Sequence, residues 1–285
     1  MFPGFTLRTV RTPEATLRVR TGGEGPPLLL LHGHPQTHVM WHLVAPRLAR
    51  HFTVVCPDLR GYGDSVGPPS TPDHEPASKR AMARDMLHLM RQLGHDRFRV
   101  AGHDRGGRVA YRLALDHPAS VERLAVLDII PTGDAWRRAD RAFALTNWHW
   151  AFLAQPHPLP ERLISANPGA FYYREGRERF APDALADYER CVHRPEVIHA
   201  MCEDYRAGAT LDDAHDRADR GVRRLRCPVL ALWSAREELE RWYDVLAVWR
   251  AWADDVRGRA LDAGHYLAEE APEEVAAELH AFFSA

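Results

Sequence analysis

Lysine is almost absent from this sequence: of its 37 lysine and arginine residues, only Lys79 is a lysine. Basic and acidic residues nearly balance, with a formal net charge of −2, which excludes a strongly basic nucleic-acid binder and a polybasic membrane anchor. The longest aliphatic run, residues 28–31, is far too short to cross a bilayer. Residues 1–8 lack a basic stretch followed by an apolar one, so we expect no signal peptide.

Cysteine is also scarce. The four cysteines, at positions 56, 191, 202 and 227, include no C-x-x-C pair and are too few for a disulfide scaffold in 285 residues. We therefore expect reduced thiols and a cytoplasmic protein, with neither nucleic acid nor a membrane as partner. The length fits one α/β domain, or one that contains an insertion.

Short apolar runs alternate with helical patterns along most of the chain. Strands are expected at 28–32, 53–57, 98–101, 124–130, 229–233 and 256–261, and helices at 79–93, 105–116, 239–253 and 272–283. Such strands are typical of a parallel sheet covered on both faces, so we predict a doubly wound α/β fold with an N-terminal hairpin at 6–20. Strands stop between 133 and 221. We expect a core domain of residues 1–132 and 222–285, with an inserted helical cap of residues 133–221.

The segment 100–108, VAGHDRGGR, has the form G-x-nucleophile-x-G between an expected strand and an expected helix. This is the context of a nucleophile elbow, where flanking glycines relieve a strained turn and the helix N-terminus favours an anion. The central residue is Asp104. A carboxylate suits displacement at a saturated carbon, because water can then cleave the alkyl ester that forms. A plain helix N-cap is the alternative. A second match, around Ser65, runs into two prolines and is not expected to be catalytic.

A nucleophilic aspartate needs a base that activates water for the second step. His265 follows the last expected strand, where this kind of fold places its histidine. The acid that orients His265 is either Asp128, at the end of one strand, or one of Glu237 and Glu238 after the next. We favour Asp128, because its shorter side chain stands directly at a strand end.

Further polar residues surround the expected nucleophile. The HGHP loop would offer the backbone N–H of His34 to an oxyanion, with that of Arg105 as second donor. Arg105 and Arg108 have i, i+3 spacing at the start of the helix and would clamp a substrate carboxylate, although surface arginines are the alternative. His34, His38 and His42 have i, i+4 spacing, but no E-x-x-H signature accompanies them. We expect no metal and no cofactor.

With these residues in place, the chain resembles the haloacetate dehalogenases, specifically the fluoroacetate dehalogenases, of the α/β-hydrolase fold. The motifs span nearly the whole chain: HGHPQTHVMWH (32–42), PDLRGYGDS (57–65), GHDRGGR (102–108), LDIIPT (127–132), HWAFLAQP (149–156), CEDYRAGA (202–209) and AGHYL (263–267). The first two also occur in epoxide hydrolases. GHDRGGR together with HW and CEDYRAG is much more specific.

The resemblance implies Asp104 as nucleophile, His265 as base and Asp128 as the partner of that base, with Arg105 and Arg108 on the substrate carboxylate. It also implies three cap residues as donors to the leaving halide: His149, Trp150 and Tyr205. The implied reaction converts fluoroacetate or chloroacetate to glycolate and halide through an ester on Asp104. This reaction needs only the haloacid and water. The resemblance also implies a homodimer. Without the resemblance, Trp150 and Tyr205 would be interpreted as part of the apolar core of the cap.

The chain departs from the family in its cap. No tryptophan occurs between 151 and 232, the cap is short between Trp150 and Tyr205, and Trp148 stands where relatives often have tyrosine. These differences leave the pocket size and the halide preference open.

Two other functions remain as alternatives. An epoxide hydrolase shares the nucleophile and base, and would use two tyrosines to protonate the epoxide oxygen. Four are available in the cap: Tyr172, Tyr173, Tyr188 and Tyr205. It does not explain a pair of arginines beside the nucleophile. A non-catalytic binding protein or receptor of the same fold is disfavoured, because a pure binder need not keep nucleophile, acid and base together.

Overall fold

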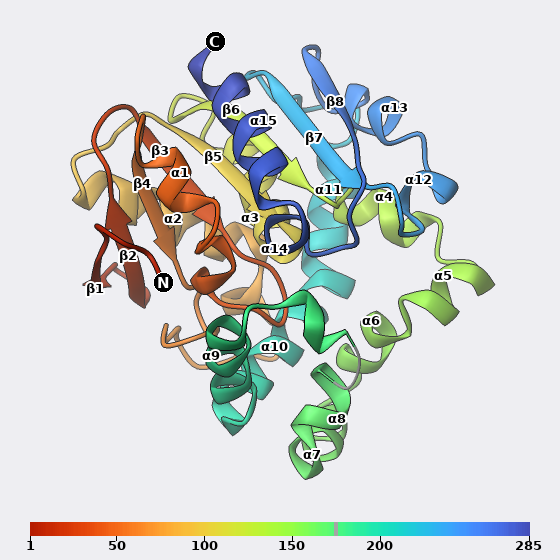
Figure 1. Ribbon diagram of the computed structural model, residues 1–285. Helices are drawn as coiled ribbons and strands as arrows, with labels where there is room; N and C mark the ends of the chain where they lie inside the picture. The colour runs from red at the N-terminus through yellow and green to blue at the C-terminus, as the bar shows by residue number, and fades with distance from the viewer. Residues whose placement is uncertain (174–175) are drawn as a thin grey trace.

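The computed structural model describes residues 1–173 and 176–285 (Figure 1). Within these residues the centre is an eight-stranded sheet of order β1-β2-β4-β3-β5-β6-β7-β8. The strands are β1 (Thr6–Arg11), β2 (Thr16–Gly22), β3 (Pro27–Leu31), β4 (Thr53–Pro57), β5 (Phe98–His103), β6 (Val121–Leu127), β7 (Val229–Ser234) and β8 (Val256–Leu261). Strand β2 pairs antiparallel with both β1 and β4, and all other neighbouring strands are parallel. The predicted fold class is confirmed.

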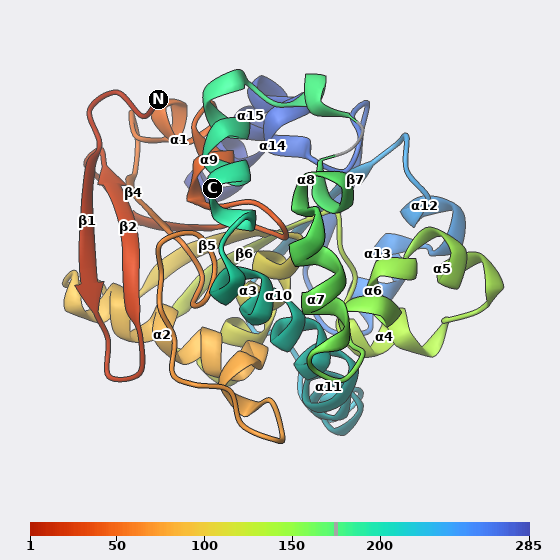
Figure 2. The same cartoon turned by 90° about the horizontal axis from the view of Figure 1, so that it is seen from below.

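Helices cover both faces of the sheet, which is why its central strands are apolar along their whole length. In Figures 1 and 2, α1 (Ala45–Leu48) and α15 (Pro272–Ser284) lie over one face, and α2 (Lys79–Gln92) and α3 (Asp104–Asp116) over the other. Three short helices complete the C-terminal part: α12 (Leu239–Trp242), α13 (Val245–Arg250) and α14 (Leu267–Glu270).

The chain between β6 and β7 contains only helices in its described residues. The α-helices are α4 (Thr132–Arg137), α5 (Arg141–Thr146), α6 (Trp148–Leu153), α7 (Leu159–Ala166), α8 (Pro168–Tyr172), α9 (Pro182–Val192), α10 (Pro195–Ala207) and α11 (Asp213–Asp219), and two further helical turns are η3 (Arg177–Arg179) and η4 (Gly208–Asp212). Figure 1 shows α5–α10 beyond the end of the sheet where β5 and β7 finish. The division into core and cap domains stays a prediction. None of the described helices is long and apolar enough to span a membrane.

Two expected elements differ from the observed ones. The strand expected at 124–130 ends at Leu127, because Asp128 turns the chain with a φ of 54°. The helix expected at 239–253 is divided into α12 and α13. Asp244 separates them: its side chain accepts a hydrogen bond from the N–H of Ala247 over 2.9 Å and so begins a new helix.

Candidate active site

A sharp strand-to-helix turn joins β5 to α3, and Asp104 is the first residue of α3. Asp104 has a φ of 47°, in the left-handed region that side chains rarely adopt. Its flanking glycines are required by space. A Cβ on Gly102 would lie 2.3 Å from the carbonyl oxygen of Gly106, and a Cβ on Gly106 would lie 2.3 Å from that of His32. The turn therefore presents Asp104 at the carboxyl edge of the sheet.

The carboxylate of Asp104 is buried and ionised. Only 8% of the residue is exposed, and the backbone N–H of His34 donates to its Oδ1 over 2.8 Å. Burial by itself raises the pKa of Asp104, but the surrounding positive charges, that of His265 foremost, outweigh burial and hold the pKa well below its usual range. The ionised carboxylate is the form that a nucleophile requires.

The imidazole of His265 is fixed by Asp128. Its Nδ1 lies 2.6 Å from Oδ2 of Asp128, whose other oxygen accepts the N–H of Ser234 over 2.9 Å. Asp128 follows directly after β6, so both acids of the site stand at neighbouring strand ends. Of the acids considered for this position, Asp128 is the one that contacts the imidazole, whereas Glu237 and Glu238 are found in the cavity lining.

The protonation of His265 depends on the charge of Asp104. Burial alone would lower the pKa of His265. The hydrogen bond and charge of Asp128, together with the charge of Asp104, reverse this and raise the pKa to about 9. The imidazole is therefore protonated at neutral pH when Asp104 is ionised, as it is in this structure. Loss of the Asp104 charge removes one cause of the raised pKa.

Arg105 does not face the cavity in this structure. Its Nε donates to both carboxylate oxygens of Asp204, at 3.1 and 3.2 Å, and its Nη2 donates to the Asp204 carbonyl over 2.8 Å. Lys79 and the hydroxyl of Tyr62 donate to the same carboxylate. The backbone N–H of Arg105 lies in the first turn of α3, where such groups have no acceptor within the helix. The substrate-binding and oxyanion roles of Arg105 stay predictions.

Arg108 does face the cavity, and no carboxylate of the described chain pairs with it. The residue is 4% exposed. Its Nη1 donates to the carbonyl of Ile130 over 2.9 Å and to the hydroxyl of Thr132 over 3.1 Å, while its Nε has no partner. Its guanidinium carbon lies 4.7 Å from the ring centroid of Trp150. A buried cation without an ion-pair partner is costly, and the cavity is where a bound anion can provide that partner.

Two of the three predicted halide donors, His149 and Trp150, lie beside the ring of the third, Tyr205. The centroids of His149 and Trp150 lie 5.9 and 6.2 Å from that of Tyr205, and all three residues line the cavity. Burial lowers the pKa of His149 to about 4, so its imidazole is neutral at neutral pH. Their roles at a halide stay predictions. Trp148 also lines the cavity, but it is 52% exposed and packs against Phe171.

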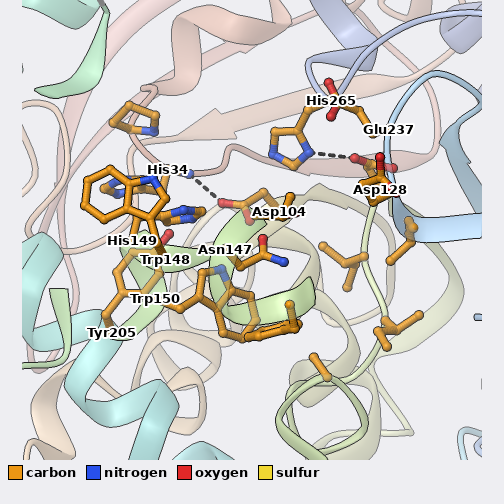
Figure 3. Close-up of a pocket in the computed structure, with 18 of the residues that line it drawn as sticks. His34, Asp104, Asp128, Asn147, Trp148, His149, Trp150, Tyr205, Glu237 and His265 are labelled. Atoms are coloured by element: carbon orange, nitrogen blue, oxygen red, sulfur yellow. Dashed lines mark hydrogen bonds and ion pairs between the residues drawn. The ribbon is translucent and has the colours of Figure 1, made fainter. Parts of the chain in front are cut away.

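The cavity has a volume of about 540 Å³. Of the predicted site residues, only Arg105 is missing from the described lining. The others are His34, Asp104, Arg108, Asp128, His149, Trp150, Tyr205 and His265. Figure 3 shows Asp104 between two groups, with His265 and Asp128 to one side and His34, His149 and Tyr205 to the other. Asp104 thus lies between the His265–Asp128 pair and a wall of aromatic side chains with N–H and O–H groups.

The sequence reasoning does not name two neighbours of the predicted residues. Asp204 holds Arg105, and Asn147 lines the cavity. Signals for both are present, since Asp204 lies in CEDYRAG and Asn147 comes just before Trp148 and the HW pair. Of the four tyrosines considered for an epoxide, only Tyr172 and Tyr205 line this cavity in the described chain.

The residues set aside from the sequence have structural partners. Ser65 donates from Oγ to the carbonyl of Asp58 over 2.8 Å, which fixes it in a turn. His38 contacts the Asp58 carboxylate over 2.7 Å, and Nδ1 of His42 contacts the carbonyl of Val39 over 3.0 Å. In the described chain, the one His-containing group with metal-ligand geometry is elsewhere, at His157, Glu161 and His199.

Comparison with known proteins agrees with this geometry. A family model of the alpha/beta hydrolase fold matches residues 26–272. The chain is 45% identical over 291 residues to a fluoroacetate dehalogenase from Burkholderia sp, covering 100% of this chain and 95% of that protein. It is 35% identical over 277 residues to a soluble epoxide hydrolase from Corynebacterium sp. (strain C12), covering 93% and 92%.

The same relationship holds for a solved structure. A protein of Nostoc sp PCC 7120, described as an alpha/beta hydrolase, superposes with a TM-score of 0.97 at 52% identity, covering 100% of this chain and 99% of that one. The chain belongs to the α/β-hydrolase fold family, and its resemblance to the haloacetate dehalogenases of that family is confirmed.

Proposed function

We propose that this hydrolase is a haloacetate dehalogenase that releases fluoride or chloride from the corresponding haloacetate and forms glycolate. The observation that carries the proposal is Arg108. Its buried guanidinium faces the cavity, and no carboxylate of the described chain forms an ion pair with it. A substrate carboxylate would form that ion pair and place the α-carbon next to the nucleophile.

In the first step, an Asp104 oxygen attacks the α-carbon. The new carbon–oxygen bond forms as the carbon–halogen bond breaks, and the halide leaves with the bonding electron pair. Donors from His149, Trp150 and Tyr205 replace the water that would otherwise stabilise the halide. The product on the enzyme is a glycolyl ester of Asp104, which has no charge on the side-chain oxygen atoms.

In the second step, His265 takes a proton from water as the water oxygen attacks Cγ of the Asp104 ester. Esterification has removed the Asp104 charge, so the pKa of His265 is lower at this stage than in the free enzyme. His265 therefore releases its proton to solvent more readily in the ester than in the free enzyme, and the neutral imidazole can act as the base. The bond between Cγ and the glycolyl oxygen then breaks, the proton taken from water returns to that oxygen, and glycolate leaves. Asp104 keeps the oxygen atom from water, and the second proton of that water passes from the new carboxyl group to His265, which restores the ionised carboxylate.

The decisive experiment follows that oxygen atom. A single turnover of fluoroacetate in H₂¹⁸O should place the label in the Asp104 peptide and leave the glycolate unlabelled. Asp104→Asn should release neither fluoride nor chloride, and His265→Ala should accumulate the ester by mass spectrometry. Label that appears in glycolate during the first turnover would instead mean direct attack by water and would refute the ester mechanism.

Epoxide hydrolysis is a second candidate because Tyr172 and Tyr205 both line the cavity. The Tyr172 hydroxyl has no hydrogen-bond partner among the described residues, so it is available to an epoxide oxygen. Epoxides carry no carboxylate, so their turnover would not need Arg108. Epoxide turnover that survives in Arg108→Leu, without haloacetate turnover in the wild type, would favour this candidate.

A further inference from the structure

The imidazole of His34 is one of the polar side chains of the cavity lining that have no part in the reaction as proposed. Its backbone N–H donates to Asp104, but its ring belongs to the cavity lining and the residue is 8% exposed. Its Nδ1 is buried and has no hydrogen-bond partner in the described part of the chain. A buried polar atom left unpaired is costly, so its position in a ligand cavity points to a partner that arrives with the ligand.

The ring of His34 lies among the predicted halide donors. Its centroid is 5.1 Å from that of Tyr205, closer than the centroids of His149 and Trp150, at 5.9 and 6.2 Å. Figure 3 shows His34 and His149 on the same side of Asp104, away from the catalytic base. The imidazole of His34 is therefore part of the polar wall that surrounds Tyr205.

The imidazole of His34 is neutral at neutral pH. Burial lowers the pKa of His34 to about 3, against the opposing charge of Asp104. A neutral imidazole has one N–H and one bare nitrogen. It can donate that N–H to an anion without first taking up a proton, as the neutral His149 can. No described protein group contacts Nδ1, so the tautomer with its N–H on Nδ1 has that donor free for a ligand.

We propose that the His34 side chain is a fourth donor to the departing halide and favours fluoride over chloride as leaving group. The inference rests on the proposed dehalogenase function. Fluoride concentrates its charge in a smaller volume and holds water more tightly than chloride. Removal of one donor therefore slows the departure of fluoride more than that of chloride. His34 would then determine leaving-group specificity through its side chain, separately from its backbone N–H.

The test compares fluoride and chloride release from fluoroacetate and chloroacetate by the wild type, His34→Phe and His34→Asn. Phenylalanine keeps a ring against Tyr205 but has no N–H, whereas asparagine keeps an amide N–H near the position of Nδ1. Both variants keep the backbone N–H that contacts Asp104. We expect His34→Phe to lower the single-turnover rate of halide release from fluoroacetate about tenfold more than that from chloroacetate, because only this step depends on the leaving group. His34→Asn should recover part of the fluoride rate.

The outcomes separate this inference from the function on which it rests. A wild type that releases both halides, with a His34→Phe variant that slows both equally or neither, would overturn the role of His34 and leave the dehalogenase proposal standing. A wild type that releases neither halide would overturn both. Thermal unfolding of the variants shows whether a rate loss follows from lost packing, which would slow both substrates alike.

Discussion

Lys79 and Arg105 share one partner, because both side chains donate to the carboxylate of Asp204. Asp204 is fully buried on α10, Lys79 begins α2, and Arg105 follows Asp104 at the start of α3. The two cations thereby join α10 to the starts of α2 and α3. Their charges outweigh the effect of burial and hold the pKa of Asp204 well below its usual range, so the carboxylate remains ionised.

Lys79→Met should destabilise the fold strongly. The substitution keeps the apolar stem of the side chain, which is 2% exposed, but leaves Asp204 and Asp212 short of a buried cation. Breaking a buried pair from one side costs about 3 kcal/mol. Urea denaturation measures this loss. Arg224→Met, which removes an exposed pair with Asp254, is the matched control and should leave the midpoint unchanged. Equal midpoints for both variants would contradict the prediction.

Arg108→Leu should lower kcat/KM for fluoroacetate by about 10- to 100-fold, because a charge-assisted contact to the substrate carboxylate is lost. Arg108→Lys keeps the charge but loses the planar guanidinium, so its kcat/KM should lie between those of Arg108→Leu and the wild type. Since no ion pair of Arg108 is found in the described chain, its removal should affect the thermal midpoint less than Arg105→Leu, which takes one of two buried cations away from Asp204. Wild-type kcat/KM in Arg108→Leu would place the substrate carboxylate elsewhere.

Hydrolysis of the ester should accelerate with rising pH, whereas formation of the ester should not. Asp104 stays ionised throughout pH 5–10, since its pKa is lowered, so the displacement step is insensitive to pH in that range. Hydrolysis needs neutral His265. Its pKa, about 9 in the free enzyme, falls when the Asp104 charge is lost. Rapid quenching with mass spectrometry should find the ester accumulating at low pH, and a decay rate that levels off below pH 9. A rate still rising above pH 9 would disprove this order of events.

Gly106→Ala should destabilise the fold by about 1–3 kcal/mol, because its Cβ would lie 2.3 Å from a backbone oxygen of His32 that cannot move away. Gly169→Ala in α8 is the matched control. A Cβ there meets only a side-chain oxygen of Asn167 at 3.9 Å, and alanine favours a helix over glycine. Thermal unfolding should therefore show a lower midpoint for the first variant and an equal or higher one for the second.

The sheet and the turn at Asp104 could be predicted from the sequence because local rules determine them. Apolar runs without alternation indicate buried parallel strands, and glycines on both sides of a polar residue indicate a tight strand-to-helix turn. The position of Asp128 followed as well, since strand ends of a parallel sheet meet at one edge. Its contact with His265 agrees with the preference for Asp128 over Glu237.

The direction of Arg105 could not be predicted, because it depends on a distant carboxylate. The spacing of Arg105 and Arg108 places both on one face of α3, yet Asp204 draws only Arg105 away from the cavity. Helix spacing says which side chains can meet, and tertiary partners decide which of them do. The role of the His34 side chain could not be predicted for the same reason: its ring lies against Tyr205 of the distant helix α10, and its loop motif indicates only a backbone N–H donor.

Because Lys79 is buried, cleavage of the chain at this residue requires the start of α2 to open. A protease that cleaves only after lysine has a single target in this sequence, and the folded protein hides it at the start of α2. Cleavage would yield two fragments, and its rate would follow the population in which α2 has separated from Asp204. A ligand that tightens the contact between α10 and α3 would slow that cleavage, so occupancy of the cavity can be followed without measuring turnover.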